Sequence, residues 1–465
     1  MMTDHQRADS LGMVQAGREV TPHLNRLASS GTNFQRCYDA CPLCVPARTA
    51  LATGKTPTHN GITTNDWAGK TAGDHKPVHQ LLKEQGYRVA HIGVDHIKLN
   101  PSLRERMNFD TWTGKETYAD YLQEKGLKAP ESGPEFRKPI LENQQGEKVA
   151  CNYSSPHCDL WPGDTEDFMD LFWCREAGNF IEAQDPRPFA LFLYLWAPHP
   201  PLQVPEPYAS LFPPEQIDLP DNIGRANAKE PACYREGIAA QLAEGESEAD
   251  WRKVWAAHLG LVHLADAGMG EILTRLHARG LQEETLVVFT SDHGDHLGQH
   301  NMYQKMEMYE QAIHVPMIWS GPEIQHHKIG TPVSHLDVLP TLIETLGLEN
   351  PGNLDGRSLS SALAGNGLSP QPVFSQYSGN PVIGDLRRAV IDGNLKYVWS
   401  PGGQCELFDL EADPLEQNNL QGQSAYEAEE IRLRTLCKNW AEAHGDFIHI
   451  EVPESPSSPH QGPAS

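Results

Sequence analysis

Short apolar runs, rich in β-branched and aromatic residues, alternate along the chain with segments of helical spacing. The clearest runs are YRVAHIG at 87–93, PFALFLYLWA at 188–197, ETLVVFT at 284–290 and VPMIWS at 315–320. Strands that alternate with helices favour an α/β fold with a large, mostly parallel sheet sandwiched by helices. Because ligand sites in such sheets lie beyond the carboxyl ends of the strands, we expect functional residues in the loops that follow these runs.

Capping residues mark several of the intervening helices. Thr21 and Pro22 suit the N-cap and first helical position of TPHLNRLASSG, and Gly86 ends VHQLLKEQG. A longer pattern of apolar residues at helical spacing begins near Trp251 and stops at Gly280. These signals predict helices long enough to cover the sheet.

The pattern changes after about residue 365. The segment RRAVIDGNLKYVWSPGGQCELFDLEADP predicts short antiparallel strands joined by glycine-rich turns, and a helix is expected at 425–444. We therefore expect a large α/β domain at 1–365 and a smaller C-terminal α+β subdomain at 366–465, whose tail EVPESPSSPHQGPAS is loose. Residues 125–165 show no periodicity and are expected to be an excursion over the surface.

The 465-residue chain carries a formal net charge of −25, which argues against a nucleic-acid partner. No apolar run is long enough to span a membrane, so we expect no membrane partner. The opening MMTDHQRADS contains no secretory signal, which predicts a cytoplasmic protein as the chain reads, or a periplasmic or secreted one if the N-terminus is truncated. The nine cysteines are odd in number and thinly spread, which excludes a disulfide scaffold.

One short stretch, CPLCVPARTALATGK at 41–55, concentrates unusual residues. A zinc clip at Cys41 and Cys44 would need a second ligand pair that the sequence lacks, and the surrounding pattern does not suit a redox pair. Pro46 suits the first turn of a helix, which places Cys44 at the helix N-terminus, where anions are attracted, with Arg48 on the same face. The alternative is that Cys44 is a small buried hydrophobe and Arg48 a surface charge.

Two further stretches place carboxylates and imidazoles just beyond expected strand ends. Asp292 and His293 follow a buried run, and Asp4 and His5 follow what would be the first strand. Such groups are plausible ligands for a divalent cation. The alternative for each pair is a helix cap and a surface histidine. Together with the stretch that contains Cys44, however, there are three such sites at the strand ends of one sheet, which favours a shared function.

Five stretches in order resemble one family. They are the opening TDHQRADSLG, the run CVPARTALATGK, the loop APHPPLQVPEPY, the stretch SDHGDHLGQHNMYQKMEMYEQAIHVPMI and the late CELFDLEADPLEQNNL. Together they resemble the type I, C-x-P-x-R sulfatases of the alkaline phosphatase superfamily over nearly the whole chain. C-x-P-x-R alone would be a weak signal.

The resemblance implies a mechanism. In that family the cysteine of C-x-P-x-R is oxidised to formylglycine (3-oxoalanine) by a formylglycine-generating enzyme, which would be a partner of this chain during maturation. The hydrated aldehyde attacks sulfur, the alcohol leaves, and the second hydroxyl provides a route for expelling sulfate. By this resemblance Cys44 is the precursor, and Asp4, His5, Asp292 and His293 form the metal site, with Ca²⁺ favoured and Mg²⁺ or Mn²⁺ as alternatives.

The remaining roles also come from the resemblance. Arg48 would hold the diol and neutralise charge, and Lys305 would bind the sulfate. His199 is the candidate general acid near the leaving oxygen, and His96 the candidate base for the release step. Asn65 would lie against the sulfate, or could instead cap a turn.

The chain departs from the family pattern in three places. Val94 stands where the family has a lysine, so a positive charge is either missing or supplied by Lys98 or Lys55. His5 stands where members have a second Asp or a Gln, and either ligates the metal or packs near it. Only two residues precede Thr3, where the family has about six apolar ones.

The expected function is therefore that of a sulfuric ester hydrolase acting on a carbohydrate or aryl sulfate. A phosphonate monoester or phosphodiester hydrolase of the same superfamily is the alternative, although that group typically has Tyr and Thr in the loop that here contains His96. A non-catalytic binder of sulfated ligands is a third hypothesis, against which the retained Cys44, Arg48 and Lys305 speak.

Overall fold

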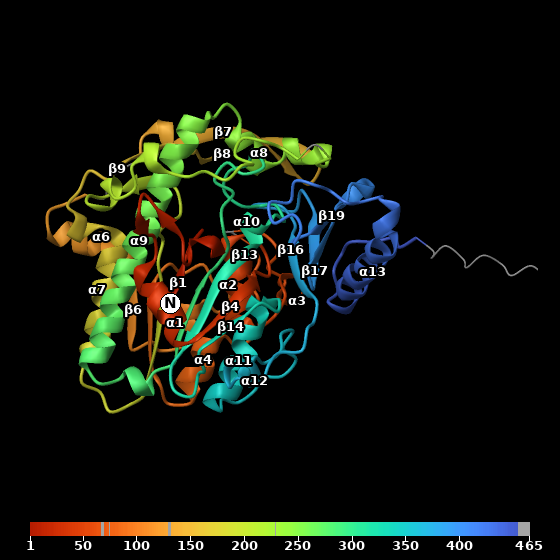
Figure 1. Cartoon of the computed structure of the whole chain (residues 1–465). Helices are drawn as coiled ribbons and strands as arrows, with labels where there is room; N and C mark the ends of the chain where they lie inside the picture. The colour runs from red at the N-terminus through yellow and green to blue at the C-terminus, as the bar shows by residue number, and fades with distance from the viewer. Residues whose placement is uncertain (67–68, 74, 129–131, 228, 454–465) are drawn as a thin grey trace, which may run out of the picture.

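The computed structural model describes residues 1–66, 69–73, 75–128, 132–227 and 229–453. A nine-stranded sheet runs through the centre of the molecule, with helices on both sides and a second, smaller sheet beside it (Figure 1). The large sheet has the order β14-β4-β13-β12-β1-β10-β5-β6, with β15 also paired to β4. These strands span His327–Ile329, Thr32–Tyr38, His314–Ser320, Val287–Ser291, Met2–Thr3, Phe189–Tyr194, Arg88–Gly93 and Thr111–Thr113, and β15 is Val333–Ser334.

The prediction of a mostly parallel sheet is confirmed. β13 runs antiparallel to its neighbours β12 and β4, and the other neighbouring strands pair in parallel. The four apolar runs named from the sequence become β5, β10, β12 and β13. The predicted first strand is β1, and it has two residues.

Alternating side chains of the sheet enter two different cores. Ala90 and Ile92 of β5 pack in the cluster formed with α1 (Pro22–Ser30), α7 (Met169–Glu182) and α9 (Glu248–Ala278). Val89 packs with α4 (Val78–Glu84) and α11 (Val338–Leu346) on the other face. Because successive strand residues point to opposite faces, both faces of the sheet are covered by helices, as a parallel sheet requires.

The C-terminal sheet is an antiparallel meander. Its strands are β16 (Val373–Tyr377), β17 (Arg387–Asp392), β18 (Leu395–Trp399) and β19 (Glu406–Asp409), and α13 (Glu427–Ala443) covers one face through Leu433 and Cys437. The predicted antiparallel sheet and helix are thus confirmed. β16 also contacts the large domain, because the Gln376 N–H donates to Ala40 O at 3.1 Å. The division into domains at residue 365 stays a prediction, and the end of the expected loose tail, 454–465, lies outside the described residues.

The surface excursion expected at 125–165 contains a regular hairpin that the sequence did not predict. β7 (Arg137–Gln144) and β8 (Glu147–Ser154) form a regular hairpin, which lies at the top of Figure 1 beside α8 (Ile238–Ala243). Gln145 and Gly146 turn it with φ of 54° and 92°, the left-handed conformation of a two-residue hairpin turn. Because polar residues lie on both faces of the hairpin, its sequence does not show the alternation of apolar and polar residues that indicates a strand.

The remaining elements are short. They are the helices α2 (Cys44–Thr53), α3 (Pro57–Asn60), α5 (Leu103–Arg106), α6 (Lys115–Glu124), α10 (Glu310–Ile313) and α12 (Ser360–Leu363), and the strands β2 (Val14–Gln15), β3 (Arg18–Glu19), β9 (Cys158–Leu160) and β11 (Leu202–Val204). Among the described residues, no helix combines the length and the apolar character that a membrane span requires.

Candidate functional site

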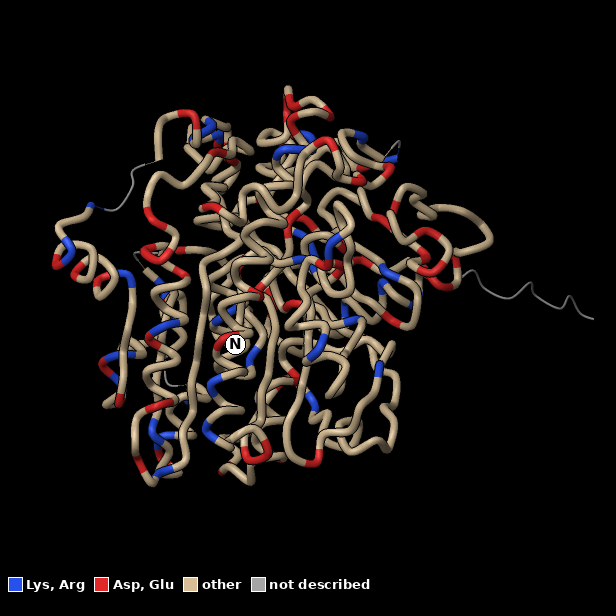
Figure 2. The backbone as a smooth tube through the Cα atoms, turned by 60° about the vertical axis from the view of Figure 1, so that its left-hand side comes forward, with Lys and Arg blue, Asp and Glu red and all other residues tan. Residues whose placement is uncertain are grey.

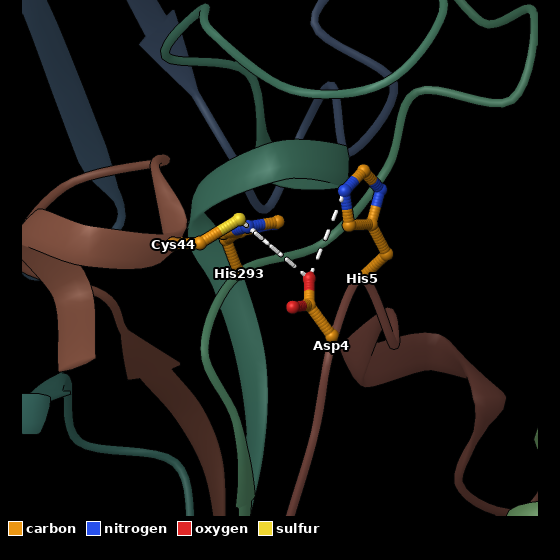
Figure 3. Close-up of side chains that lie close together, drawn as sticks. All are labelled: Asp4, His5, Cys44 and His293. Atoms are coloured by element: carbon orange, nitrogen blue, oxygen red, sulfur yellow. Dashed lines mark hydrogen bonds and ion pairs between the residues drawn. The ribbon is translucent and has the colours of Figure 1, made fainter. Parts of the chain in front are cut away.

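Three segments converge at the carboxyl ends of the central strands. Asp4 follows β1, Asp292 follows β12, and Cys44 opens α2. The parallel register pairs Thr3 with Ser291, so the next residue of each strand, an aspartate, enters the same space. Figure 3 shows Asp4 between Cys44 and His5, with His293 beside the sulfur atom.

Cys44 is the first residue of a helix that is buried on every side. All ten residues of α2 are buried, which explains its small and apolar side chains, and Gly54 ends it in the left-handed conformation. The Cys44 Sγ lies 3.1 Å from Lys305 Nζ, 3.3 Å from His293 Nε2 and 3.8 Å from Asp4 Oδ1. Burial, aided by Asp4, raises the pKa of the Cys44 thiol to about 12, so the unmodified side chain is a neutral thiol.

Arg48 lies one turn further along α2 and binds both aspartates. Its Nε donates to Asp292 Oδ2 at 2.8 Å and its Nη2 donates to Asp4 Oδ2 at 2.7 Å. The guanidinium therefore holds two buried carboxylates, leaving the Oδ1 atoms of both near His293 Nε2, at 3.7 Å each. The alternative of a surface charge for Arg48 is wrong, because only 1% of the residue is exposed.

The two aspartates differ in their pKa values. Burial and the neighbouring Asp292 raise the pKa of Asp4 to about 7, despite Arg48. Burial also opposes ionisation of Asp292, but His293 and Arg48 hold its pKa at about 2. Burial thus disfavours the ionised form of Asp4 although Arg48 and Lys305 lie near it, and a divalent cation beside this carboxylate would favour ionisation.

The donor atoms fit a divalent cation. One ligand atom from each of Asp4, His5, Cys44 and His293 lies within 4.8 Å of the others. His293 Nδ1 lies 3.1 Å from Gly294 O, so this nitrogen donates to the carbonyl and the lone pair of Nε2 faces the cluster. Within this cluster, the carboxylates of Asp4 and Asp292 with the imidazole of His293 form a set that suits Ca²⁺, Mg²⁺ or Mn²⁺.

His5 makes contacts that sequence reasoning missed. Its Nδ1 lies 2.7 Å from Asp295 Oδ2, and its Nε2 lies 2.5 Å from Lys305 Nζ. Asp295 also accepts the backbone N–H groups of Leu297 and Gln304 through Oδ1, and so fixes the loop that leads to Lys305. The stretch DHGDH placed Asp295 near the site, but no spacing rule pointed to a pair with His5.

His199 and His96 lie around a tryptophan that the sequence did not single out. The ring centroid of Trp196 is 4.0 Å from that of His199 and 6.0 Å from that of His96. The His199 ring also lies 4.5 Å from that of His5, which joins it to the cluster. Buried Asp170 accepts the backbone N–H groups of Trp196 and Ala197 at 2.6 and 2.9 Å, which fixes this loop.

The pKa values of both histidines are lowered. Burial, with Lys305, lowers the pKa of His199 well below 6.5, and burial, with Arg48, does the same for His96. His199 Nδ1 donates to Pro200 O, which leaves Nε2 as the nitrogen available to a ligand.

Asn65 and the two alternative lysines have different surroundings. The Asn65 Oδ1 accepts the Val45 N–H at 3.1 Å and thereby satisfies a backbone donor in the first turn of α2. The Lys55 ammonium donates to Gly352 O at 3.4 Å. Lys98 follows β5 in the loop that contains His96, and Val94 is buried in the main core.

Comparisons with known proteins find relatives that match most of the chain. The family model described as Sulfatase matches residues 1–348, and the model described as N-sulphoglucosamine sulphohydrolase, C-terminal, matches residues 298–442. An ulvan-active sulfatase from Formosa agariphila is 26% identical, over 96% of this chain and 81% of its own length. An N-acetylglucosamine-6-O-sulfatase from Bacteroides thetaiotaomicron is 25% identical, over 96% and 86%. The solved phosphonate monoester hydrolase from Silicibacter pomeroyi shares the fold, with a TM-score of 0.78 at 23% identity over 96% of this chain and 95% of that one.

Proposed function

Because the chain belongs to the sulfatase family of sulfuric ester hydrolases, we propose that it cleaves a sulfate monoester of a carbohydrate with a nucleophile made from Cys44. The observation that carries this proposal is the position of Cys44. Its side chain opens a buried helix, within 4 Å of Lys305, His293 and Asp4. A nucleophile there would meet an anionic ester among groups that stabilise negative charge.

Cys44 would act after conversion to formylglycine by a formylglycine-generating enzyme, and the hydrated aldehyde would then supply the attacking oxygen. Asp4, Asp292 and His293 would hold a divalent cation, Ca²⁺ by preference, which would supply positive charge for the reacting groups. His5 is a further candidate ligand, although its Nε2 faces Lys305.

Two side chains would hold the sulfate and its developing charge. Lys305 lies against Cys44, and although burial opposes it, the carboxylates of Asp4 and Asp292 help to raise the pKa of Lys305 and so favour its cationic form. Arg48 orients both aspartates and adds a second fixed positive charge. Such preorganised charges act strongly in a site from which water is excluded. Asn65 supports the same end of α2 through its side-chain oxygen. Its side-chain amide nitrogen would donate a hydrogen bond to the sulfate.

Proton transfer would fall to the two histidines around Trp196. His199 would give a proton from Nε2 to the leaving oxygen, since its Nδ1 is held by Pro200 O. His96 would accept the proton that is released when the nucleophile is regenerated. Both rings lie beside Trp196, and all three side chains are half-buried.

The carbohydrate substrate is supported by two relatives, whose names specify ulvan and N-acetylglucosamine 6-O-sulfate. A phosphonate monoester hydrolase is the second candidate, because a solved enzyme of that kind shares the fold over nearly the whole chain. His96 beside Trp196 favours the sulfatase. Parallel assays of matured protein with 4-nitrophenyl sulfate, sulfated sugars and phenyl phosphonate esters test the proposal. Turnover of the phosphonate esters alone would refute it.

A further inference from the structure

A lysine that the proposed mechanism does not use stands at the mouth of the site. Lys115 is the first residue of α6, and its Nζ lies 3.8 Å from the ring centroid of Trp196. Trp196 in turn lies against His199, the residue proposed to protonate the leaving oxygen. Lys115 therefore reaches the site from the leaving-group side, whereas Lys305 reaches it at Cys44.

The Lys115 ammonium is available for a ligand. Among the described residues, no carboxylate lies within ion-pairing distance of it, and its recorded contact is with the indole ring. The other two cations of the site are engaged, Arg48 with Asp4 and Asp292, and Lys305 with Cys44 and His5. Figure 2 shows acidic and basic positions interspersed along the chain, in which the acidic residues are the more numerous.

The charge of Lys115 affects the pKa values of residues inside the site. After burial, which is the main cause, Lys115 contributes to the lowered pKa values of His96 and His199, and it opposes the raised pKa of Asp4. Lys115 is exposed, but partial desolvation by its neighbours lowers its pKa, and Asp4 is the strongest group opposing that change. A partly desolvated ammonium gains more from an anionic partner than a fully hydrated one.

We propose that Lys115 and Trp196 form a subsite for a second anionic group, a carboxylate or a second sulfate, carried by the leaving group next to the sulfate ester. This inference rests on the proposed function and names its substrate class, which is a sulfated sugar or aryl compound with an additional negative charge near the scissile bond. Lys115 would pair with the second anion, and Trp196 would hold Lys115 in place through the contact of the ammonium with its ring. Lys115 is thus a specificity-determining residue.

Matched aryl sulfates test the subsite. The probes are 2-carboxy-4-nitrophenyl sulfate, its 2-sulfo analogue and its methyl ester, which carries no charge at the 2-position. They are assayed with matured wild-type protein and with the variants Lys115→Gln, Lys115→Arg and Lys128→Gln. Differences in leaving-group acidity cancel when the ratio of kcat/KM for a charged probe to that for the ester is compared between variants. We expect this ratio to fall at least ~10-fold in Lys115→Gln, mainly through KM, and to stay within ~3-fold of the wild-type ratio in Lys115→Arg. The control Lys128→Gln alters an exposed lysine just after the same helix, and its ratio should be unchanged. The larger fall of the two charged probes identifies the anion as carboxylate or sulfate.

Two results would overturn the proposal. An unchanged ratio in Lys115→Gln would show that Lys115 contacts no anion of the leaving group, and an equal loss on charged and uncharged probes would place Lys115 at the sulfate itself. Calorimetric binding of the same probes to Cys44→Ala protein, with and without Lys115→Gln, gives the comparison without turnover. Failure of all hydrolysis would therefore contradict the proposed function, whereas loss of the binding preference in Lys115→Gln would still support the subsite.

Discussion

The Nζ of Lys305 lies 3.1 Å from the Sγ of Cys44, although the two residues are 261 positions apart in the chain. The loop that carries Lys305 is fixed by Asp295, and His5 bridges Asp295 and Lys305 through its two ring nitrogens. An ammonium held in this way next to the nucleophile needs no reorganisation when charge develops on the substrate. The predicted effects of mutations follow from this arrangement.

Removal of the Lys305 charge should cost more than ~10²-fold in kcat/KM for a sulfate ester, the scale of losing one charge-stabilising donor. Lys305→Ala and the control Lys128→Ala are compared in steady-state kinetics, with folding checked by thermal melting. Equal kinetics in the two variants would mean that Lys305 does not touch the transition state.

Loss of one carboxylate should weaken the metal site. Asp292→Asn removes a charge that Arg48 and the cation would share, so we expect at least ~10-fold weaker Ca²⁺ binding by calorimetry. The exposed Asp159→Asn should bind Ca²⁺ as the wild type does. Chelation should abolish activity, and added Ca²⁺ should restore it. Full activity in protein shown by elemental analysis to be free of metal would refute a metal-dependent site.

The role of His199 should depend on the leaving group. A general acid matters most when the leaving alcohol is weakly acidic, so His199→Ala should cost at least ~10²-fold with an alkyl or sugar sulfate and much less with 4-nitrophenyl sulfate. Burial lowers the pKa of His199 below 6.5, and the acid must be protonated to act, so kcat/KM for the alkyl ester should fall as pH rises through that lowered pKa. An identical loss on both substrates at every pH would rule out proton donation by His199.

Salt should not weaken capture of a small anionic ester. The net charge of −25 repels the substrate at long range, and that repulsion is screened, whereas contacts with Arg48 and Lys305 inside the buried site are screened little. We therefore expect kcat/KM to be unchanged or to rise between low and moderate ionic strength. Neutralising the half-buried Glu429 and Glu430 on α13, which lies on the small C-terminal sheet, should change little. A steep fall with salt would show that long-range attraction captures the substrate.

The sequence predicted the parts of the fold that local signals define. Pro46 and Gly54 mark the start and end of α2, and the buried runs become the central strands, because a sheet covered on both faces needs continuous apolar residues. β4 was not predicted, since its run TNFQRCY mixes polar and apolar residues without a clear period. The β7–β8 hairpin was missed for the same reason.

The site could be predicted only as separate motifs. Asp4, Cys44, Asp292 and His293 each belong to a recognisable stretch, and the sheet register brings them together. Asp295, Trp196 and Lys115 could not be found in this way, because their contacts join segments whose relative positions are set by tertiary packing. Lys115 in particular lies in an ordinary amphipathic helix, and only its place over Trp196 distinguishes it.

The central claim is that a nucleophile made from Cys44 cleaves sulfate esters. Its most direct test is the turnover of 4-nitrophenyl sulfate by protein co-expressed with a formylglycine-generating enzyme, with the Cys44 peptide analysed by mass spectrometry in the same preparation. We predict that Cys44 is converted to the aldehyde while Cys41 stays a thiol, and that Cys44→Ala lowers turnover at least ~10³-fold. Near-normal turnover by Cys44→Ala, or by wild-type protein whose Cys44 remains a thiol, would contradict the account.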